Sequence, residues 1–135
     1  MPHTQLIQAA LGAREQSVAP YSKFNVGAAL LTASGEIFSG ANVESASYGL
    51  SCCAERVALF KALTDESKSQ RDFTHIAIAS PGGAAPCGAC RQLLAEYAGK
   101  AEVILIDSES PGKPTVTTMG VLLPNAFTGD DFPEA

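Results

Sequence analysis

Three cysteines and one glutamate are the residues of this chain whose types and spacing could support chemistry. Cys53 and Glu55 lie two positions apart in the apolar stretch SCCAERVAL, and Cys87 and Cys90 lie three positions apart in PCGACRQLL. A catalytic zinc ion keeps three protein ligands and leaves a fourth position open for water. A carboxylate beside that water can take its proton and return it to a leaving group. The pattern therefore predicts a zinc site with Cys53, Cys87 and Cys90 as ligands and Glu55 as the proton carrier.

A fourth protein ligand is not expected. Cys52 is adjacent to Cys53, and because neighbouring residues rarely bind one ion, we interpret Cys52 as a structural thiol. His3 lies in the terminal segment, and His75 opens an expected strand, where an ordinary, partly exposed histidine is the simpler interpretation. Three thiolates and Zn²⁺ sum to one negative charge, so we expect the guanidinium of Arg56 to donate to a sulfur and offset it; a surface arginine is the alternative.

Each of the chemical residues also has a simpler interpretation. Glu55 could be a favourable acid in a first helical turn, and Cys53 could be a small buried apolar residue. The Cys87–Cys90 pair could be a redox motif, but the thioredoxin type needs no upstream Cys-x-Glu. We favour zinc because the simpler interpretations would all have to hold at once.

The elements that position these residues follow from helical geometry. Residues two apart on a helix point about 200° apart, so Cys53 and Glu55 can serve one site only where a helix begins. We predict helices over 53–64 and from Cys87 to about Gly99, with their N-termini meeting at the site. The positive end of each helix dipole would stabilise thiolates there.

The rest of the chain alternates strand and helix patterns. Apolar spacing predicts a helix over 4–17, and apolar residues surround the axis of the 53–64 helix, which we expect to be buried on most sides. The turn TASGE inside the β-rich stretch 24–43 predicts a hairpin. The remaining predictions are strands at 74–80 and 101–107, a loop at 108–114, and a short strand and a helical turn that stops before Pro124. The fold class that follows is a three-layer α/β/α sandwich around a mixed β-sheet, with one domain over 1–135 and a loose tail at 129–135.

The bulk composition limits the partners. Of the 135 residues, 46% are hydrophobic and 17% are charged, which is enough for a real core. A net charge of -5 and the lack of a Lys/Arg cluster argue against a nucleic-acid partner. Because the chain shows no membrane-span pattern and no signal peptide, we expect a soluble, cytoplasmic protein with reduced cysteines.

The arrangement C-x-E followed by P-C-x-x-C resembles that of the zinc-dependent deaminases. Five further stretches resemble the small cytidine deaminases of nucleoside salvage: APYSKFNVGAALL, GANVESASYG, CAERVALFKAL, APCGACRQLLAEY and LLPNAF. The resemblance runs from about residue 4 to residue 127 and departs at Ala85, where the family motif has serine. It implies hydrolytic deamination of cytidine, and of 2′-deoxycytidine, to the uridine product and ammonia, with one zinc per chain.

The resemblance also implies the roles of residues that bind the nucleoside. Asn42 and Glu44 would hydrogen-bond the ribose 3′-hydroxyl, and Phe24 would pack against the nucleoside. The backbone around Ala54, together with the Glu55 carboxylate, would read the pyrimidine. Taken alone, an asparagine after SGA is equally typical of a turn, and an aromatic residue that opens an apolar strand is typical of a core.

The family forms homotetramers with shared sites, so the resemblance places Ala46, Tyr48 and Phe127 in a neighbour's site. Two rival functions stay open. One is a deaminase of the same fold acting on another aminopyrimidine, such as a blasticidin-type compound. The other is a non-catalytic zinc-binding scaffold, which would have no use for an acid at an open coordination position.

Overall fold

The computed structural model describes residues 3–65 and 72–132. The helices and strands of the chain follow one another in this order: α1 (Thr4–Ala13), β1 (Gly27–Thr32), β2 (Ile37–Ala41), α2 (Ala54–Leu63), β3 (Phe73–Ser80), α3 (Gly88–Tyr97), β4 (Glu102–Asp107), β5 (Thr115–Thr118) and α4 (Met119–Leu122). Single 3₁₀ turns occur at Arg14–Gln16, Tyr48–Leu50 and Gly129–Asp131.

The strands form one mixed sheet in the order β2-β1-β3-β4-β5. β1 and β2 form the predicted hairpin, β1 also pairs antiparallel with β3, and β4 pairs antiparallel with β5. β3 and β4 are parallel and are joined through α3. This is the strand–helix–strand unit that the alternating sequence pattern predicts.

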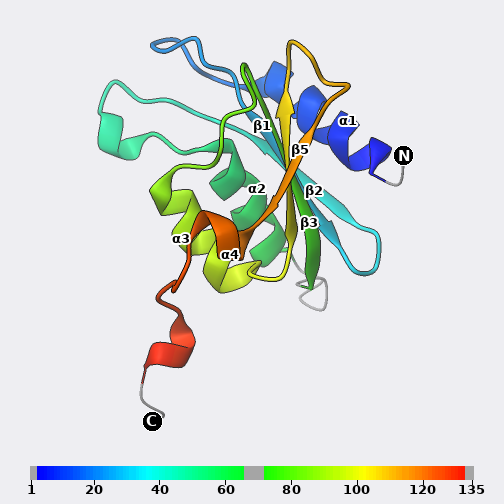
Figure 1. Ribbon diagram of the computed structural model, residues 1–135. Helices are drawn as coiled ribbons and strands as arrows, with labels where there is room; N and C mark the ends of the chain where they lie inside the picture. Colours follow the sequence, from blue (N-terminus) through cyan, green and yellow to red (C-terminus); the bar gives the residue numbers. More distant parts are fainter. Residues whose placement is uncertain (1–2, 66–71, 133–135) are drawn as a thin grey trace.

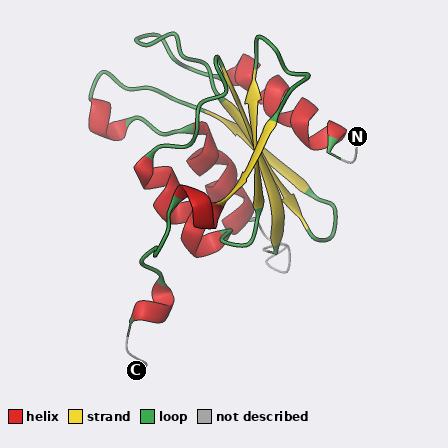
Figure 2. Ribbon diagram, in the orientation of Figure 1, coloured by secondary structure: helices red, strands yellow, loops and turns green. Residues whose placement is uncertain are grey.

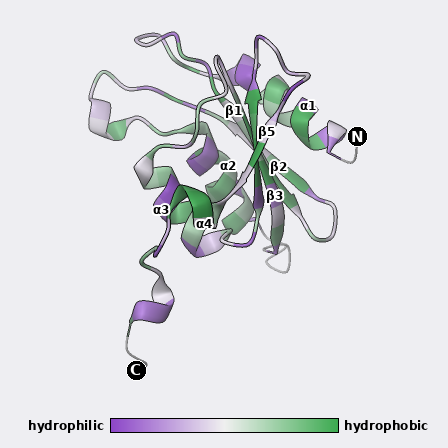
Figure 3. Cartoon of the chain, in the orientation of Figure 1, coloured by the Kyte–Doolittle hydropathy of each residue, from purple (hydrophilic) through white to green (hydrophobic). Residues whose placement is uncertain are grey.

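Helices cover both faces of the sheet, which confirms the predicted three-layer sandwich (Figures 1 and 2). On one face, Leu6 and Ala10 of α1 pack against apolar residues of β1, β3 and β4. On the other face, α2, α3 and α4 pack around a larger core. The apolar residues gather along the strands between these layers (Figure 3). Small alanines on several strands let both helix layers lie close to the sheet.

Two glycines in the hairpin allow the closest approach of helix to sheet. A Cβ atom at Gly27 would lie 2.0 Å from the Ala10 carbonyl oxygen of α1. A Cβ atom at Gly40 would lie 2.6 Å from the Ala58 backbone nitrogen of α2. Real side chains do not approach backbone so closely, so each glycine fixes how one helix sits on the sheet.

The burial of α2 follows the prediction except at one apolar residue. Ala54, Ala58, Leu59 and Ala62 are buried against the sheet, but Phe60 is 43% exposed. Of the ten residues of this helix, only Phe60 and Lys61 are exposed, and the other eight are buried or partly buried. The helix is therefore covered on most sides, as predicted, with Phe60 as the apolar exception.

The chain after α4 runs away from the body of the molecule (Figure 1). Within it, Thr128 caps the turn Gly129–Asp131 in a capping box. Residues 133–135 lie outside the described part, so the loose tail stays a prediction. Of the helices described, none combines the length and apolar character that crossing a membrane requires.

Candidate active site

Three segments that are far apart in the sequence lie side by side next to the start of α2. Val43, just beyond β2, forms isolated bridges with Val18 on one side and with Cys52 on the other. Four backbone hydrogen bonds hold this ribbon, among them Cys52 N to Val43 O at 2.8 Å and Glu44 N to Val18 O at 2.8 Å. The ribbon therefore fixes the entry to α2 relative to the hairpin and to the loop before β1.

Two helices begin at the site, as the spacing of the cysteines predicts. Cys53 is the N-cap residue of α2, and Cys87 is the N-cap residue of α3. The Sγ atoms of Cys53 and Cys87 lie 3.6 Å apart. Together with Cys90, whose side chain is buried in the first turn of α3, the three sulfurs lie within 4.8 Å of one another. This thiol cluster fits one zinc ion per chain, because three converging soft ligands are the donor set that zinc prefers.

The electrostatics of the thiols favour a thiolate at Cys53. Its hydrogen bond with Cys90 is the main reason that the pKa of Cys53 is lowered to about 5, and a bond from Arg56 lowers it further. Conversely, the pKa of Cys90 is raised by the same hydrogen bond and by burial. Arg56 Nη2 lies 3.5 Å from the Cys53 sulfur. This contact places the guanidinium where charge compensation predicts it.

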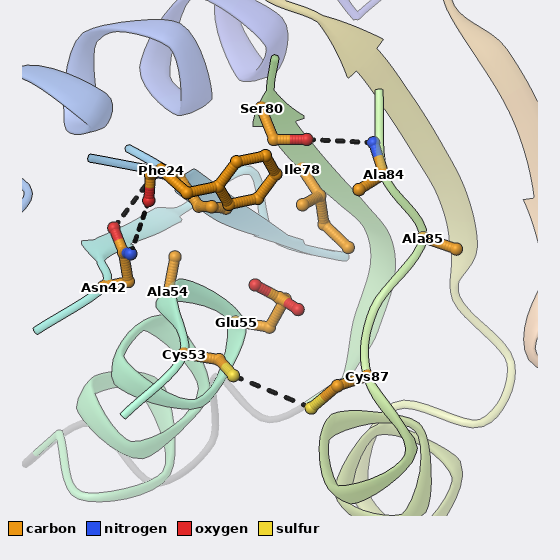
Figure 4. A pocket seen from close by; sticks show the side chains of 11 residues that line it. Phe24, Asn42, Cys53, Ala54, Glu55, Ile78, Ser80, Ala84, Ala85 and Cys87 are labelled. Carbon is orange, nitrogen blue, oxygen red and sulfur yellow. Dashed lines mark hydrogen bonds between the residues drawn. The ribbon is translucent and has the colours of Figure 1, made fainter. Parts of the chain in front are cut away.

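Glu55 follows the N-cap of α2 by two positions and points into the pocket beside the sulfurs (Figure 4). Its side chain is only 5% exposed. Burial raises the pKa of Glu55, and the charge of Cys53 raises it further. A carboxyl group with a raised pKa holds a proton more readily near neutral pH, which suits a group that must both accept and donate one.

The pocket itself has a volume of ≈ 190 Å³. Its lining includes Phe24, which faces Glu55 across the space, and Ala54 at the start of α2 (Figure 4). The lining residues are Phe24, Val26, Asn42, Cys53, Ala54, Glu55, Ile78, Ser80, Ala84, Ala85 and Cys87. Most of the predicted substrate residues thus surround the predicted chemical groups.

Asn42 has its side chain already engaged with the surrounding loop. Its Oδ1 accepts from Val26 N at 3.0 Å and from the Ser17 hydroxyl, and its Nδ2 donates to Phe24 O at 2.8 Å. An asparagine amide carries two N–H donors, so these bonds leave one N–H for a substrate.

Glu44 lines a neighbouring pocket with Tyr21, Ser22 and Tyr48 instead of the first pocket. Its carboxylate accepts from the backbone nitrogens of Tyr21 and Ser22, both at 3.1 Å, and from the Ser22 hydroxyl. These bonds, that of the hydroxyl above all, lower the pKa of Glu44. Asn42 and Glu44 therefore lie in adjacent hollows in the single chain.

The residues assigned to a neighbour's site lie outside the first pocket. Tyr48 is 81% exposed and Phe127 is 55% exposed, and Ala46 is exposed as well. The Phe127 backbone oxygen accepts a hydrogen bond from Gln92 Nε2 at 2.7 Å. Of the three, Tyr48 lines the neighbouring pocket with Glu44.

Two residues that support the site were not singled out from the sequence. Ser80, at the end of β3, accepts from Ala84 N at 2.9 Å and so shapes the loop that precedes α3. Arg91 donates through Nε to Pro86 O and through Nη1 to Leu122 O, both at 2.8 Å. Arg91 could have been singled out from the sequence, because it directly follows Cys90 and so places a positive charge next to the expected zinc ligands. Ser80 carried no such signal.

Comparisons with known proteins agree with this site. Residues 1–106 match the model of the cytidine and deoxycytidylate deaminase zinc-binding region. The cytidine deaminase of Halalkalibacterium halodurans is 45% identical over 134 residues, which cover 98% of each chain. A crystal structure of cytidine deaminase from Burkholderia pseudomallei has a TM-score of 0.85 at 51% identity and covers 94% of this chain and 100% of that chain. The blasticidin-S deaminase of Bacillus cereus is 34% identical over 117 residues, which cover 79% of each chain.

Proposed function

The chain belongs to the cytidine and deoxycytidylate deaminase family, and on that premise we propose that its first pocket is where cytidine is hydrolysed to uridine and ammonia. The activity is that of a zinc-dependent hydrolase acting on the amino group of cytidine, and 2′-deoxycytidine is the expected second substrate. The observation that carries the assignment is Glu55, a buried carboxyl group that shares the pocket with the thiol cluster.

The thiols of Cys53, Cys87 and Cys90 would hold the zinc, and Arg56 would offset their charge. Zinc bound there would lower the pKa of a water molecule to about 7. Glu55 accepts the proton of that water and passes it to N3 of the base, while the water oxygen forms a bond to C4. Glu55 then takes the remaining proton from the new C4 hydroxyl and gives it to the amino group, the C4–N bond breaks as the C4 carbonyl forms, and ammonia leaves.

The nucleoside is oriented by residues around the same pocket. Phe24 packs against it, and the backbone at Ala54 reads the pyrimidine. The free N–H of Asn42 and the Glu44 carboxylate bind the ribose 3′-hydroxyl. Carboxylate oxygens offer about four acceptor positions, so Glu44 can hold the loop and still accept from a sugar.

We infer that the working form is a cytoplasmic homotetramer in which Ala46, Tyr48 and Phe127 complete a neighbour's site. The exposed aromatic side chains of Tyr48 and Phe127 support this assignment, as does the segment that carries Phe127 away from the body of its own chain (Figure 1). All four cysteines are free thiols, which is the state expected in a reducing compartment.

The direct test is the conversion of cytidine by purified Glu55→Gln protein. Glutamine keeps the shape of the side chain and removes the proton carrier. Since general acid–base groups contribute roughly 10²–10⁴ in rate and this one serves several steps, we expect a loss of kcat at the upper end of that range. Uridine and ammonia are measured together with zinc content, which should stay at one ion per chain.

The matched control is Glu96→Gln, an exposed glutamate of α3, which should keep full activity. If Glu55→Gln protein retained more than about a tenth of the rate, outside the effect expected of a general acid–base group, the proton would travel by another route. Zinc without any turnover in the unchanged protein would favour the non-catalytic scaffold.

A blasticidin-type aminopyrimidine is the second candidate substrate, because the chain is 34% identical to a protein named blasticidin-S deaminase. Asn42 and Glu44 favour the plain nucleoside, since an amide donor and a carboxylate acceptor suit a sugar hydroxyl. Competition between cytidine and blasticidin S, scored as kcat/KM, decides between them.

A further inference from the structure

A second cluster of metal-ligating side chains lies at the other end of the sheet from the thiol cluster. His3 is the N-cap residue of α1, and Glu102 is the first residue of β4. His75, near the start of β3, is paired with Glu102 across the parallel strands. Because side chains alternate along a strand, both point to the face that α1 covers, as do Ala77 and Ile104.

The three groups are close enough to share an ion. The rings of His3 and His75 have centroids 4.2 Å apart. One ligand atom from each of His3, His75 and Glu102 lies within 4.8 Å of the other two. Tetrahedral zinc with bonds of about 2.1 Å holds neighbouring ligand atoms roughly 3.4 Å apart. Small rotations of three partly buried side chains would bring them to that spacing.

The hydrogen bonds of His75 prepare it as a ligand. The Thr74 hydroxyl donates to Leu31 O at 3.3 Å, so its oxygen is left to accept from His75 Nδ1, 2.9 Å away. The proton of the neutral ring then sits on Nδ1, and Nε2 carries the free lone pair. Metal-binding histidines are held in this way, with the second nitrogen donating to a nearby oxygen.

His3 adds a nitrogen that lacks a partner. Its Nδ1 atom is buried and has no hydrogen-bond partner within residues 3–65 and 72–132. A buried polar atom left unpaired is unfavourable, and a bound cation beside the rings would relieve the cost. Burial lowers the pKa of His75, and His3 lowers it further, which favours the neutral ring that binds metals.

We propose that His3, His75 and Glu102 form a second metal site, for a divalent transition cation such as Zn²⁺, which ties the start of α1 to β3 and β4. Two imidazoles and one carboxylate are a ligand set for such ions, with water completing the coordination. The site is independent of the catalytic pocket, since His75 and Ser80 are separated by about 16 Å of strand at ~3.3 Å per residue.

The test uses untagged protein that already holds one zinc per chain. Calorimetric titration with ZnCl₂, checked by elemental analysis, should show one further ion per chain. A parallel titration with Co²⁺ should give visible d–d bands without sulfur-to-metal charge transfer, because the second site has no thiolate. His75→Gln should weaken the second ion by roughly 10- to 100-fold or more, and should leave the first zinc and the turnover of cytidine unchanged.

Glu102→Gln is the second variant, in case His75→Gln perturbs the fold, and should also weaken the second ion. Glu96→Gln, an exposed carboxylate elsewhere, should not. Excess zinc should raise the Tm of the unchanged protein and not that of the His75 variant. A stoichiometry that stays at one ion, or a second ion bound equally well by both site variants, would overturn the proposal.

Discussion

The side chains of Asn42 and Glu44 stabilise the fold in addition to their proposed role in binding the substrate. Their side chains bond to Phe24, Val26 and Ser22 of the loop that leads into β1. The loop also carries Phe24, which faces Glu55 across the pocket (Figure 4). A substrate hydroxyl bound by Asn42 and Glu44 would therefore be positioned by the same bonds that position the aromatic ring.

This arrangement gives a prediction about the sugar. Asn42→Ala should lower kcat/KM for cytidine by roughly 10- to 100-fold, because a buried polar group left without its partner costs about 1–3 kcal/mol. Glu44→Gln should lower it too, because it removes a charged acceptor for the sugar hydroxyl. A substrate that lacks the 3′-hydroxyl should lose far less. The measurement is kcat/KM for cytidine and for 3′-deoxycytidine with each variant.

Because both residues also hold the loop, part of any loss will be common to the two substrates. Ser22→Ala removes the loop bonds of this hydroxyl to Glu44 and to Phe24 N and no proposed substrate contact, so it reports that common part. If the 3′-deoxy analogue suffered as much as cytidine in all three variants, Asn42 and Glu44 would have no place in the ribose site.

Helical geometry explains why the central residues could be predicted. Cys53 and Glu55 cannot share a site from the side of a helix, so the sequence required a helix start, and α2 begins between them. Ser80 could not be predicted in the same way. Its role depends on the loop to Ala84, which folds over the end of β3, and a serine after an apolar strand has no distinctive spacing.

Gly40 sets how α2 lies against the hairpin, and α2 carries Glu55. Gly40→Ala should destabilise the protein by about 1–3 kcal/mol, the usual effect of overpacking, and should lower activity by shifting α2. Gly12→Ala is the matched control, because Gly12 is exposed in α1 with open space around it. It should stabilise by about 0.5–1 kcal/mol.

Chemical denaturation and the cytidine assay check both glycine variants. Equal stability of the two would mean that α2 has room to move away from the hairpin without cost. Such a result would also remove the link between Gly40 and the position of Glu55.

The elements themselves were predictable where the pattern was local. The hairpin followed from its turn, and the parallel pair β3–β4 followed from strand–helix–strand order. The exposure of Phe60 on α2 was not predictable, because a sequence does not tell whether this side chain is covered by its own chain or by another. Burial is a property of the assembly, and the apolar pattern alone cannot assign it.

In solution, we expect light scattering to give the mass of four chains. Glu55→Gln chains and Phe127→Ala chains, mixed and reassembled, should regain activity. A restored site takes Glu55 from one parent and Phe127 from the other. Phe127→Ala must first be shown to be damaging by itself.

A monomer at micromolar concentration would contradict the shared site. So would a reassembled mixture no more active than the mean of its parents. Reassembled unchanged protein is the control for losses during mixing.

The position of the thiol cluster has a consequence for the lifetime of the folded chain. Cys53 and Cys87 are 34 residues apart, and closing a contact over so many residues is entropically costly. We therefore expect the cluster to close late in folding, and interactions absent from the transition state act mainly on the unfolding rate. We expect zinc to slow unfolding while leaving the folding rate nearly unchanged, which denaturant-jump kinetics with and without a chelator would measure. A newly made chain would then reach its fold without waiting for the ion, and would keep that fold because of it.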